Sequence, residues 1–499
     1  MAAIVLMLLR VILVLVGYTF AAENGSTTRY CELVDSLIPG SVSYADNPVY
    51  RESLSSYYSG QESDLRPGCI FSPKSASEVS LFVKIVTSKQ NCSISPQFAV
   101  RSGGHTIWSG AANIDGGITV DLRAMNTLEL SEDKTVAYVG AGGIWSEIYA
   151  QLVPYNLTIM GGRVAGIGVG GLATGGGIHY LSRRNGWVCD NVYNYEVVLA
   201  SGEIVQASAG SYSDLWLALK GGSNNFGIIT RIDVPTWPQG LMWGGSIAFN
   251  YTHQVLDGQA EAFSDFMKPE NFDDAADMGM ALIFQNPGNV YAIGNSLYYV
   301  EAVENPAVYQ PFISIPGQVG RQLVFANAST FPIQAGGTLP PDTRRAIDIV
   351  YSFKNGGPDI YSSIFESWEN GTKVLAAIEG LQLVLLIQPH PVTNGTNSLG
   401  LPPSEKDIVL TVITAAYAHR EDDEMVQNEM QSIIDSHVSL LKRHGLYIPF
   451  EYLNYADKSQ DPIGSYGEEV KCRLQDASRK YDPDGVFQTQ VPGGFKLFN

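Results

Sequence analysis

The chain has 499 residues, of which 45% are apolar and 16% charged, and its formal net charge is −19. This composition is typical of a globular protein, and the length exceeds what one hydrophobic core usually supports, so we expect two or more lobes. The acidic charge and the lack of Lys/Arg clusters argue against nucleic acid or an anionic membrane as a partner.

The N-terminus has the pattern of a signal peptide. Residues 1–17 are an apolar run interrupted by Arg10, and the small residues Thr19 and Ala21 suit signal peptidase. We predict a cleaved leader over residues 1–21 and a secreted monomer with no membrane contact after cleavage; an uncleaved anchor is the alternative. Seven possible glycosylation sites agree with export. They are Asn24, Asn91, Asn156, Asn250, Asn327, Asn370 and Asn394.

The cysteines and histidines give no sign of a metal site. No Cys-x-x-Cys pair occurs, and the seven histidines lack the spacing of metal ligands. Five cysteines allow at most two disulfides and leave one thiol over. They are Cys31, Cys69, Cys92, Cys189 and Cys472.

Strands and helices alternate from about residue 66 to 235, which predicts an α/β lobe. Ser75 and Glu78 form a capping box before apolar residues at helical spacing, so a helix is predicted from there to Val86. Further elements follow in order: strands at 98–100, 118–122 and 135–139, and a helix over 144–152.

Mixed strands and helices are predicted from about residue 240 to 450, after the break at Pro235–Pro238. One helix is well marked, because acidic residues from Glu421 begin it and basic residues before Gly445 end it, which complements the helix dipole. Its predicted buried face consists of Met430, Ile433, Ile434, Val438 and Leu441.

Two glycine-rich segments are candidates for a ligand site. Gly166–Gly171 satisfies the G-x-G-x-x-G pattern, but three glycines at 175–177 follow where a nucleotide-binding fold needs a long helix. We therefore predict a loop whose backbone amides approach an anion, with tight turns alone as the alternative. Arg101–His105 follows a strand and combines exposed amides with an imidazole. That suits a diphosphate beside a reactive histidine, although His105 could also be an ordinary surface or core histidine.

These segments occur together with further motifs in a fixed order. The set comprises Ala99–His105, Gly161–Gly171, Gly175–Gly177, Asp190–Val192, Val197–Gly202, Asp214–Gly222, Asn224–Arg231, Tyr452–Asp457 and Tyr481–Phe487. Together they resemble the berberine bridge enzyme-like family of the vanillyl-alcohol oxidase / p-cresol methylhydroxylase (PCMH) flavoproteins. The likeness covers most of the mature chain.

The resemblance implies FAD bound covalently through His105, which stands where the family links an imidazole nitrogen to the flavin 8α-methyl group. Many relatives add a bond from a cysteine to flavin C6. Val164 stands at that position here, which implies a single attachment and argues against a bulky sugar substrate. The other implied cofactor contacts are Arg101, Ser102, Gly103, Gly104, Thr106, Gly168, Gly170, Gly175, Gly176 and Ile229.

The implied fold is α+β: an FAD-binding lobe of two α/β subdomains, and a substrate lobe whose antiparallel sheet, covered by helices, lies over the flavin. In relatives a disulfide joins the positions of Cys31 and Cys92, which would tie the N-terminus to the FAD lobe. The implied boundaries are a signal peptide at 1–21, an N-terminal segment at 22–65, the PCMH-type domain at 66–238, the substrate domain at 239–449 and a returning C-terminal segment at 450–499.

Tyr452 and Asn454 match the family's Tyr-x-Asn, which places side chains beside the flavin ring. Tyr452 is our candidate base, although a phenol with a pKa of about 10 is a poor base without a cationic neighbour, and it could instead shape the pocket floor. Asn454 is expected to hydrogen-bond substrate or flavin. His179 either faces the flavin or packs in the core.

The expected reaction is hydride transfer from a small organic substrate to flavin N5, with O2 as acceptor and H2O2 as product. The motifs most resemble family members from secondary-metabolite pathways. Two alternatives stay open: a secreted carbohydrate or alcohol oxidase, and a flavin-binding secreted glycoprotein that no longer catalyses.

Overall fold

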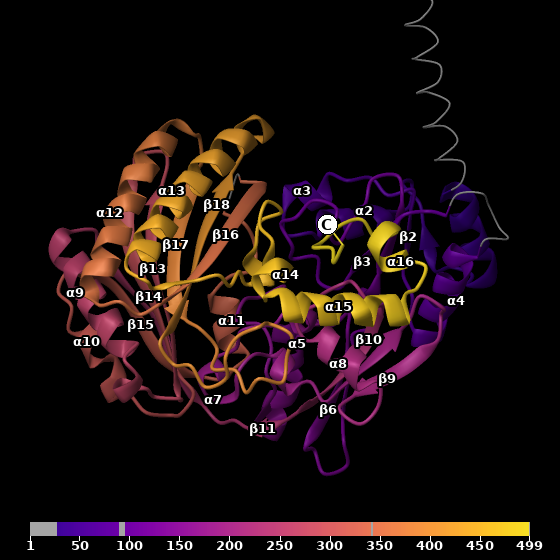
Figure 1. Ribbon diagram of the computed structural model, residues 1–499, viewed down its shortest axis with the longest axis horizontal. Coiled ribbons are helices and arrows are strands. Elements are labelled where there is room, and N and C mark those ends of the chain that lie inside the picture. The colour runs from indigo at the N-terminus through magenta and orange to yellow at the C-terminus, as the bar shows by residue number, and fades with distance from the viewer. Residues whose placement is uncertain (1–26, 89–94, 341–342, 499) are drawn as a thin grey trace, which may run out of the picture.

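The computed structural model describes residues 27–88, 95–340 and 343–498. The predicted signal peptide, Asn24, Asn91 and Cys92 lie outside these ranges. Two lobes stand side by side (Figure 1), one built mainly from the N-terminal half and the C-terminal segment, the other from the chain between them. The α+β class with an antiparallel substrate sheet is confirmed.

The first lobe contains two sheets of different character. In the four-stranded sheet the central strands run parallel, and in the five-stranded sheet all pairs are antiparallel. In spatial order the first is β1 (Val42–Ser43), β2 (Cys69–Phe71), β4 (Ile118–Asp121) and β3 (Phe98–Arg101). The second is β5 (Leu128–Leu130), β6 (Val136–Gly140), β10 (Ile228–Pro235), β8 (Asn194–Val198) and β9 (Ile204–Ser208).

Local sequence signals in this lobe act as expected. The helix α4 spans Ala76–Thr87, and the Ser75 side chain accepts a hydrogen bond from the Glu78 amide at 3.2 Å. Its apolar face, including Val79 and Phe82, is fully buried in the core of the lobe. The capped, one-sided sequence therefore positions this helix against the sheets.

The second lobe is built on an antiparallel sheet of eight strands. A short pair, β7 (Leu157–Thr158) and β11 (Trp237–Pro238), lies just before it in the chain. In spatial order the eight strands are β15 (Gln318–Ala326), β12 (Met242–Asn250), β14 (Val290–Tyr299), β13 (Ala276–Gln285), β17 (Gln382–Pro389), β18 (Ile408–Tyr417), β16 (Arg345–Lys354) and β19 (Tyr447–Ile448).

The two faces of this sheet have different neighbours. Side chains alternate along β17, so Leu383 and Leu385 join the core beneath the helices, whereas Leu386 and Gln388 face a cavity between the lobes. Figure 1 shows the long helices on the outer face. The covering helices are α9 (His253–Phe266), α12 (Pro358–Val374) and α13 (Asp423–Arg443). The last of these is the helix that the charge pattern predicts between residues 421 and 445.

Short helices fill the connections, and the C-terminal segment lies against the first lobe (Figure 1). The Phe98 amide donates to the Gln490 carbonyl oxygen at 2.7 Å, and the Asn225 side chain donates to the Phe495 carbonyl oxygen at 2.8 Å. The remaining helices are α2 (Pro48–Ser55), α3 (Gly60–Ser63), α5 (Trp145–Leu152), α6 (Val169–Thr174), α7 (Ser182–Asn185), α8 (Ser213–Leu219), α10 (Gln310–Ile313), α11 (Thr330–Gln334), α14 (Pro462–Ser465), α15 (Glu468–Tyr481) and α16 (Val486–Thr489).

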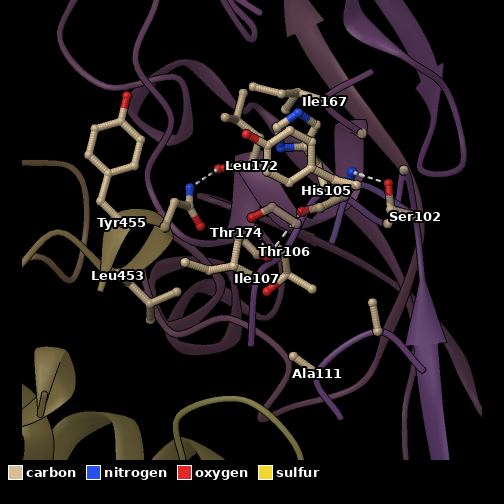
Figure 2. A pocket seen from close by; sticks show the side chains of 18 of the residues that line it. Ser102, His105, Thr106, Ile107, Ala111, Ile167, Leu172, Thr174, Leu453 and Tyr455 are labelled. Atoms are coloured by element: carbon tan, nitrogen blue, oxygen red, sulfur yellow. Dashed lines mark hydrogen bonds between the residues drawn. The ribbon is translucent and has the colours of Figure 1, made fainter. Parts of the chain in front are cut away.

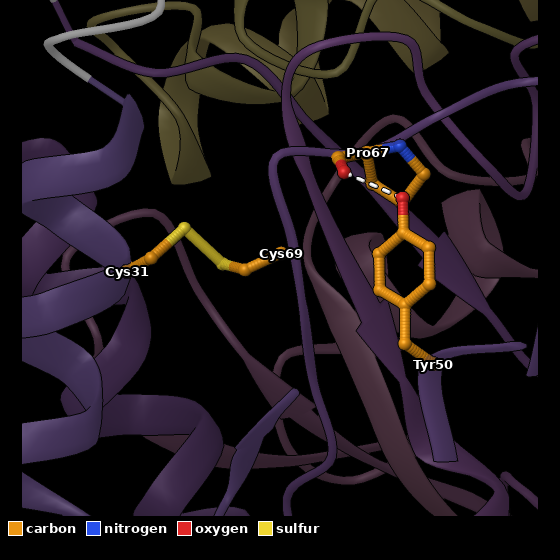
Figure 3. Close-up of a disulfide and its surroundings, with 4 residues drawn as sticks. All are labelled: Cys31, Tyr50, Pro67 and Cys69. Atoms are coloured by element: carbon orange, nitrogen blue, oxygen red, sulfur yellow. Dashed lines mark hydrogen bonds between the residues drawn. A yellow bond between two sulfur atoms is a disulfide. The ribbon is translucent and has the colours of Figure 1, made fainter. Parts of the chain in front are cut away.

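The disulfide differs from the one expected. Cys31 pairs with Cys69, not with Cys92 (Figure 3). Residues 27–37 are helical, and this helix lies beside the start of β2, which brings the two Cα atoms to 6.2 Å. The bond still ties the N-terminal helix to the first lobe. Near it, the Tyr50 hydroxyl donates to the Pro67 carbonyl oxygen at 2.8 Å.

Among the residues that the structure describes, no helix has the length and apolar character needed to span a bilayer. Within the same ranges no group of three or more His, Cys, Asp or Glu side chains is arranged to hold a metal ion.

Candidate functional site

A cavity of about 610 Å³ lies between the two lobes. Its walls come from the His105 loop, the glycine-rich loop before α6, the inner face of the eight-stranded sheet and the C-terminal segment. Figure 2 shows Leu453 and Tyr455 on one side of this space, and Ser102 and His105 on the other. Its size suits a cofactor with a small substrate.

Glycines shape the wall because the two loops approach each other closely. A Cβ atom on Gly103 would lie 2.5 Å from the Gly168 amide nitrogen, and one on Gly168 would overlap the Gly103 amide. Ser102 joins the loops: its hydroxyl donates to the Ala141 carbonyl oxygen at 2.6 Å and accepts from the Gly170 amide at 3.1 Å. This wall leaves backbone, not side chains, beside the cavity, which suits a phosphate-bearing ligand.

His105 lines the cavity at the end of its loop. Its Nε2 atom is buried and has no hydrogen-bond partner within the described structure. Burial lowers the pKa of the imidazole to about 4, so the ring is neutral at physiological pH. A neutral imidazole with an unpaired nitrogen, on a residue that lines a cavity, can act as a nucleophile toward an electrophilic carbon of a bound ligand.

Not every residue expected to contact a cofactor lines the cavity. Ser102, Gly103, Gly104, Thr106, Gly168, Gly170 and Ile229 do. Arg101 instead is fully buried behind the loop, where it donates to the Ser53 and Ser56 carbonyl oxygens at 2.6 and 3.0 Å.

Gly175 and Gly176 are also absent from the cavity wall, and their role is to make room for the predicted catalytic pair. A Cβ atom on Gly175 would overlap the Asn454 carboxamide, and one on Gly176 would lie 3.0 Å from the Tyr452 ring. The glycine triplet thus allows the C-terminal segment to pack close to α6. The sequence pattern alone does not distinguish this packing function from ligand contact.

Tyr452 and Asn454 both line the cavity and contact each other. The Tyr452 hydroxyl oxygen accepts hydrogen bonds from the Gly177 amide at 2.9 Å and from the Asn454 carboxamide at 3.0 Å. Burial raises the pKa of Tyr452 well above its usual range. This phenol is therefore held neutral and is a poor proton acceptor.

Sequence reasoning missed a carboxylate on the inner face of the sheet. Asp348, on β16, lines the cavity, and its Oδ1 atom is buried without a hydrogen-bond partner in the described structure. Burial raises the pKa of Asp348 to about 6, while a hydrogen bond from Thr414, its neighbour on β18, opposes the shift. No sequence motif marks Asp348, because its place beside the cavity depends on how β16 pairs with its neighbouring strands.

A second missed feature connects the lobes beside Val164. The Arg163 guanidinium donates to the Asp277 carboxylate at 2.9 Å and to the Gln388 carboxamide oxygen at 2.5 Å. Arg163 and Gln388 line the cavity, and the Gln388 Nε2 atom is buried and unpaired among the described residues. Arg163, from the first lobe, thus holds the oxygen of the Gln388 carboxamide and leaves its NH2 group available as a donor on the sheet.

His179 does not line the cavity. It is 1% exposed, and its Nδ1 atom accepts from the Leu181 amide at 3.2 Å. Its ring lies against Tyr149 and Tyr180, so packing is the role that the structure assigns to it. Val164 does line the cavity, at the position where many relatives have cysteine.

Comparison with known proteins shows which proteins the chain is similar to. Residues 67–208 match the family described as an FAD binding domain. The FAD-dependent monooxygenase tpcD of Cochliobolus heterostrophus is 34% identical over 459 residues, covering 88% of this chain and 87% of that protein. The FAD-dependent monooxygenase CTB5 of Cercospora beticola is 35% identical over 498 residues, with 95% and 93% covered. Bifunctional solanapyrone synthase of Alternaria solani is 31% identical over 497 residues, with 96% and 92% covered.

Solved structures share the fold at lower identity. 6-Hydroxy-D-nicotine oxidase of Arthrobacter nicotinovorans superimposes with a TM-score of 0.75 at 20% identity, covering 90% of this chain and 96% of that one. Glucooligosaccharide oxidase of Acremonium strictum, which carries a 6-S-cysteinyl, 8α-N1-histidyl FAD, gives a TM-score of 0.73 at 16% identity, with 91% and 97% covered.

A PCMH-type FAD-binding domain joined to an antiparallel substrate sheet defines a class of enzymes, the FAD-linked oxidoreductases. Within that class the chain belongs to the family of the FAD-dependent monooxygenases that it resembles over nearly its whole length, and it shares the fold of a berberine bridge enzyme-like structure.

Proposed function

We propose that this protein binds FAD covalently through His105 and oxidises a small organic molecule of secondary metabolism. One observation carries the proposal. A neutral imidazole with an unpaired nitrogen stands beside a glycine wall, across a cavity from a sheet that carries a buried carboxylate. The orphaned nitrogen and the closely spaced glycines fit an isoalloxazine with its diphosphate.

FAD, held by His105 and the glycine wall, would supply the redox chemistry: it would take up a hydride from a substrate C–H bond, and O2 would accept the electrons to give H2O2. The chain supplies the proton chemistry. Asp348 accepts the substrate proton. Its raised pKa of about 6 makes it a stronger base than an ordinary carboxylate, and Asp348 is still ionised near neutral pH. Tyr452 and Asn454 shape the floor and orient the bound molecules.

The walls favour a flat, partly apolar substrate. Leu386 on the sheet and Tyr298, Leu453 and Tyr455 around it present apolar and aromatic surface, with few polar atoms among them. A carbohydrate or alcohol oxidase stays the alternative substrate class, because the fold is shared with oligosaccharide oxidases. Peroxide release from a panel of sugars compared with a panel of aromatic polyketide-like compounds separates the two.

A second candidate reaction is monooxygenation, which the names of the relatives favour. An oxidase returns both oxygen atoms of O2 as peroxide, whereas a monooxygenase places one atom in the product. Turnover under isotopically labelled O2 distinguishes them: label in the product with no peroxide would replace the oxidase proposal.

Secretion is part of the proposal. A disulfide joins Cys31 to Cys69, as is usual in proteins that fold in an oxidising compartment. The sequon residues Asn156, Asn250, Asn370 and Asn394 are exposed, as glycan attachment requires, and Asn327 is half-buried.

The test of the cofactor claim uses the full chain from a secreting host. Acid-precipitated wild-type protein should stay yellow, and the peptide containing His105 should gain the mass of FAD. His105→Ala should give a colourless precipitate. If wild-type precipitate is colourless and the peptide mass is unmodified, covalent attachment is disproved. If no compound in a broad screen reduces the bound flavin, the non-catalytic alternative is favoured.

A further inference from the structure

The His105 loop is held by a short segment outside the glycine-rich motifs. The Tyr58 ring stacks on the His105 imidazole with centroids 4.0 Å apart and an angle of 17° between the planes. The Tyr58 amide donates to the Gly104 carbonyl oxygen at 3.0 Å, and the Ser59 hydroxyl donates to the Thr106 carbonyl oxygen at 3.2 Å. The residues before and after His105 are thus bound to the same segment, residues 57–59, which we call the clasp.

The clasp is itself anchored. The Tyr57 hydroxyl donates to the Ala112 carbonyl oxygen at 2.9 Å, and the Arg101 guanidinium lies 3.8 Å from the centre of the Tyr57 ring. Arg101 also binds the end of α2 through the Ser53 and Ser56 carbonyl oxygens. Because both ends of the clasp are fixed to the FAD lobe, the Tyr58 ring has a defined position over the imidazole.

The stacked Tyr58 ring restricts rotation of the His105 side chain, which a hydrogen bond to the imidazole could otherwise restrict. The Nε2 atom of His105 has no partner within the described structure, so hydrogen bonding does not orient the ring from that side. Bond formation at a ring nitrogen requires that the nitrogen face the reacting carbon at near contact distance. The Tyr58 face is the one rigid aromatic surface that contacts this imidazole in the described structure.

We propose that Tyr58 is a positioning residue for flavin attachment: by stacking, it holds the His105 ring so that a nitrogen faces the 8α-methyl group of FAD. The proposal rests on the covalent link proposed above. In the net change a C–N bond replaces one methyl C–H bond and the imidazole N–H bond. Two protons and two electrons leave the pair, and O2 accepts them to give H2O2. Tyr58 takes no part in this exchange beyond orientation.

The experiment measures attachment, not turnover. Full-length protein is prepared from a riboflavin-limited secreting host, FAD is added, and the acid-stable fraction of the flavin is followed with time. Tyr58→Ala removes the stack, whereas Tyr58→Phe keeps it and removes only the hydroxyl. Because an aromatic pair contributes modestly, Tyr58→Ala should slow attachment by about threefold to tenfold, and Tyr58→Phe should match the wild type.

The outcomes separate the two claims. If the wild type gains no acid-stable flavin, both the covalent link and the role of Tyr58 are overturned. Equal rates for wild type and Tyr58→Ala overturn the role of Tyr58 alone, and so does a Tyr58→Phe variant as slow as Tyr58→Ala. If Tyr58→Ala is not secreted, Tyr58→Leu, which fills the volume without an aromatic face, is judged by the same criterion. Non-covalent FAD binding, measured in parallel, should be retained in every stacking variant.

Discussion

Asp348 is the residue on which the proposed proton chemistry depends. Because the base acts in its ionised form, kcat/KM of the wild type should fall tenfold per pH unit below pH about 6, where Asp348 becomes protonated. Asp348→Asn should lower kcat by about 100-fold or more and abolish that acid limb. Steady-state kinetics across pH, with flavin content as the normaliser, measure both effects.

Thr414→Val is the matched control for this residue. The Thr414 hydrogen bond lowers the pKa of Asp348, so its loss should move the acid limb to higher pH and leave the plateau rate close to that of the wild type. A full plateau rate in Asp348→Asn, or an acid limb that persists there, would assign the base to another group.

The family resemblance could nominate the proposed cofactor end of the site, but it did not mark Asp348 or Arg163. His105 and the glycines lie in contiguous motifs, so their likeness to a known family is sufficient to nominate them. Asp348 and Arg163 have functional neighbours only through strand register and lobe packing, which join residues far apart in the sequence. The expected Cys31–Cys92 bond was wrong because it came from the family pattern, whereas the fold brings Cys31 to Cys69 at the start of β2.

At the scale of elements, the contact between the two glycine-rich loops determines the cavity wall. Gly168→Ala should displace the His105 loop, since the new Cβ atom would overlap the Gly103 amide. We expect most bound FAD to be lost, measured as flavin per protein after purification. Gly171 lies in α6, the helix that Gly168 precedes as N-cap, and the Cβ atom of Gly171→Ala would meet no neighbour within 4 Å. Equal flavin content in the two variants would contradict this account.

The sheet also shows why fold class was predictable where detailed contacts were not. Alternating and helical apolar patterns report which face of an element is buried, and α4 and α13 follow them, although Val438 of the predicted face of α13 is only half-buried. The order of eight antiparallel strands, with β15 and β19 at the edges, depends on pairings between distant segments. Pattern alone does not encode that order.

At the scale of the whole molecule, the Arg163–Asp277 ion pair fastens one lobe to the other. Asp277 is 2% exposed, so Arg163→Met should leave an unpaired buried carboxylate and lower the free energy of unfolding by about 3–5 kcal/mol. The double variant Arg163→Met/Asp277→Leu should recover most of that loss. Denaturant unfolding of the three proteins provides the measurement.

Arg184 in α7 serves as the control, because it also links the two lobes, through Asp274 just before β13 at 2.9 Å and Glu301 just after β14 at 3.2 Å, but these side chains remain in contact with water. Arg184→Met should cost about 1 kcal/mol or less. Similar losses from the two single variants would mean that burial does not govern the lobe contact.

The return of the C-terminal segment has a consequence for the timing of biosynthesis. Val491 and Phe495 line the cavity, and the Gln490 carbonyl oxygen accepts a hydrogen bond from the amide of Phe98, the first residue of β3. When His105 leaves the ribosome, the part of the chain that closes the groove over it has not been translated. If FAD is attached as proposed, its capture is therefore expected to follow translation, and a nascent chain stalled before residue 490 should be released without flavin.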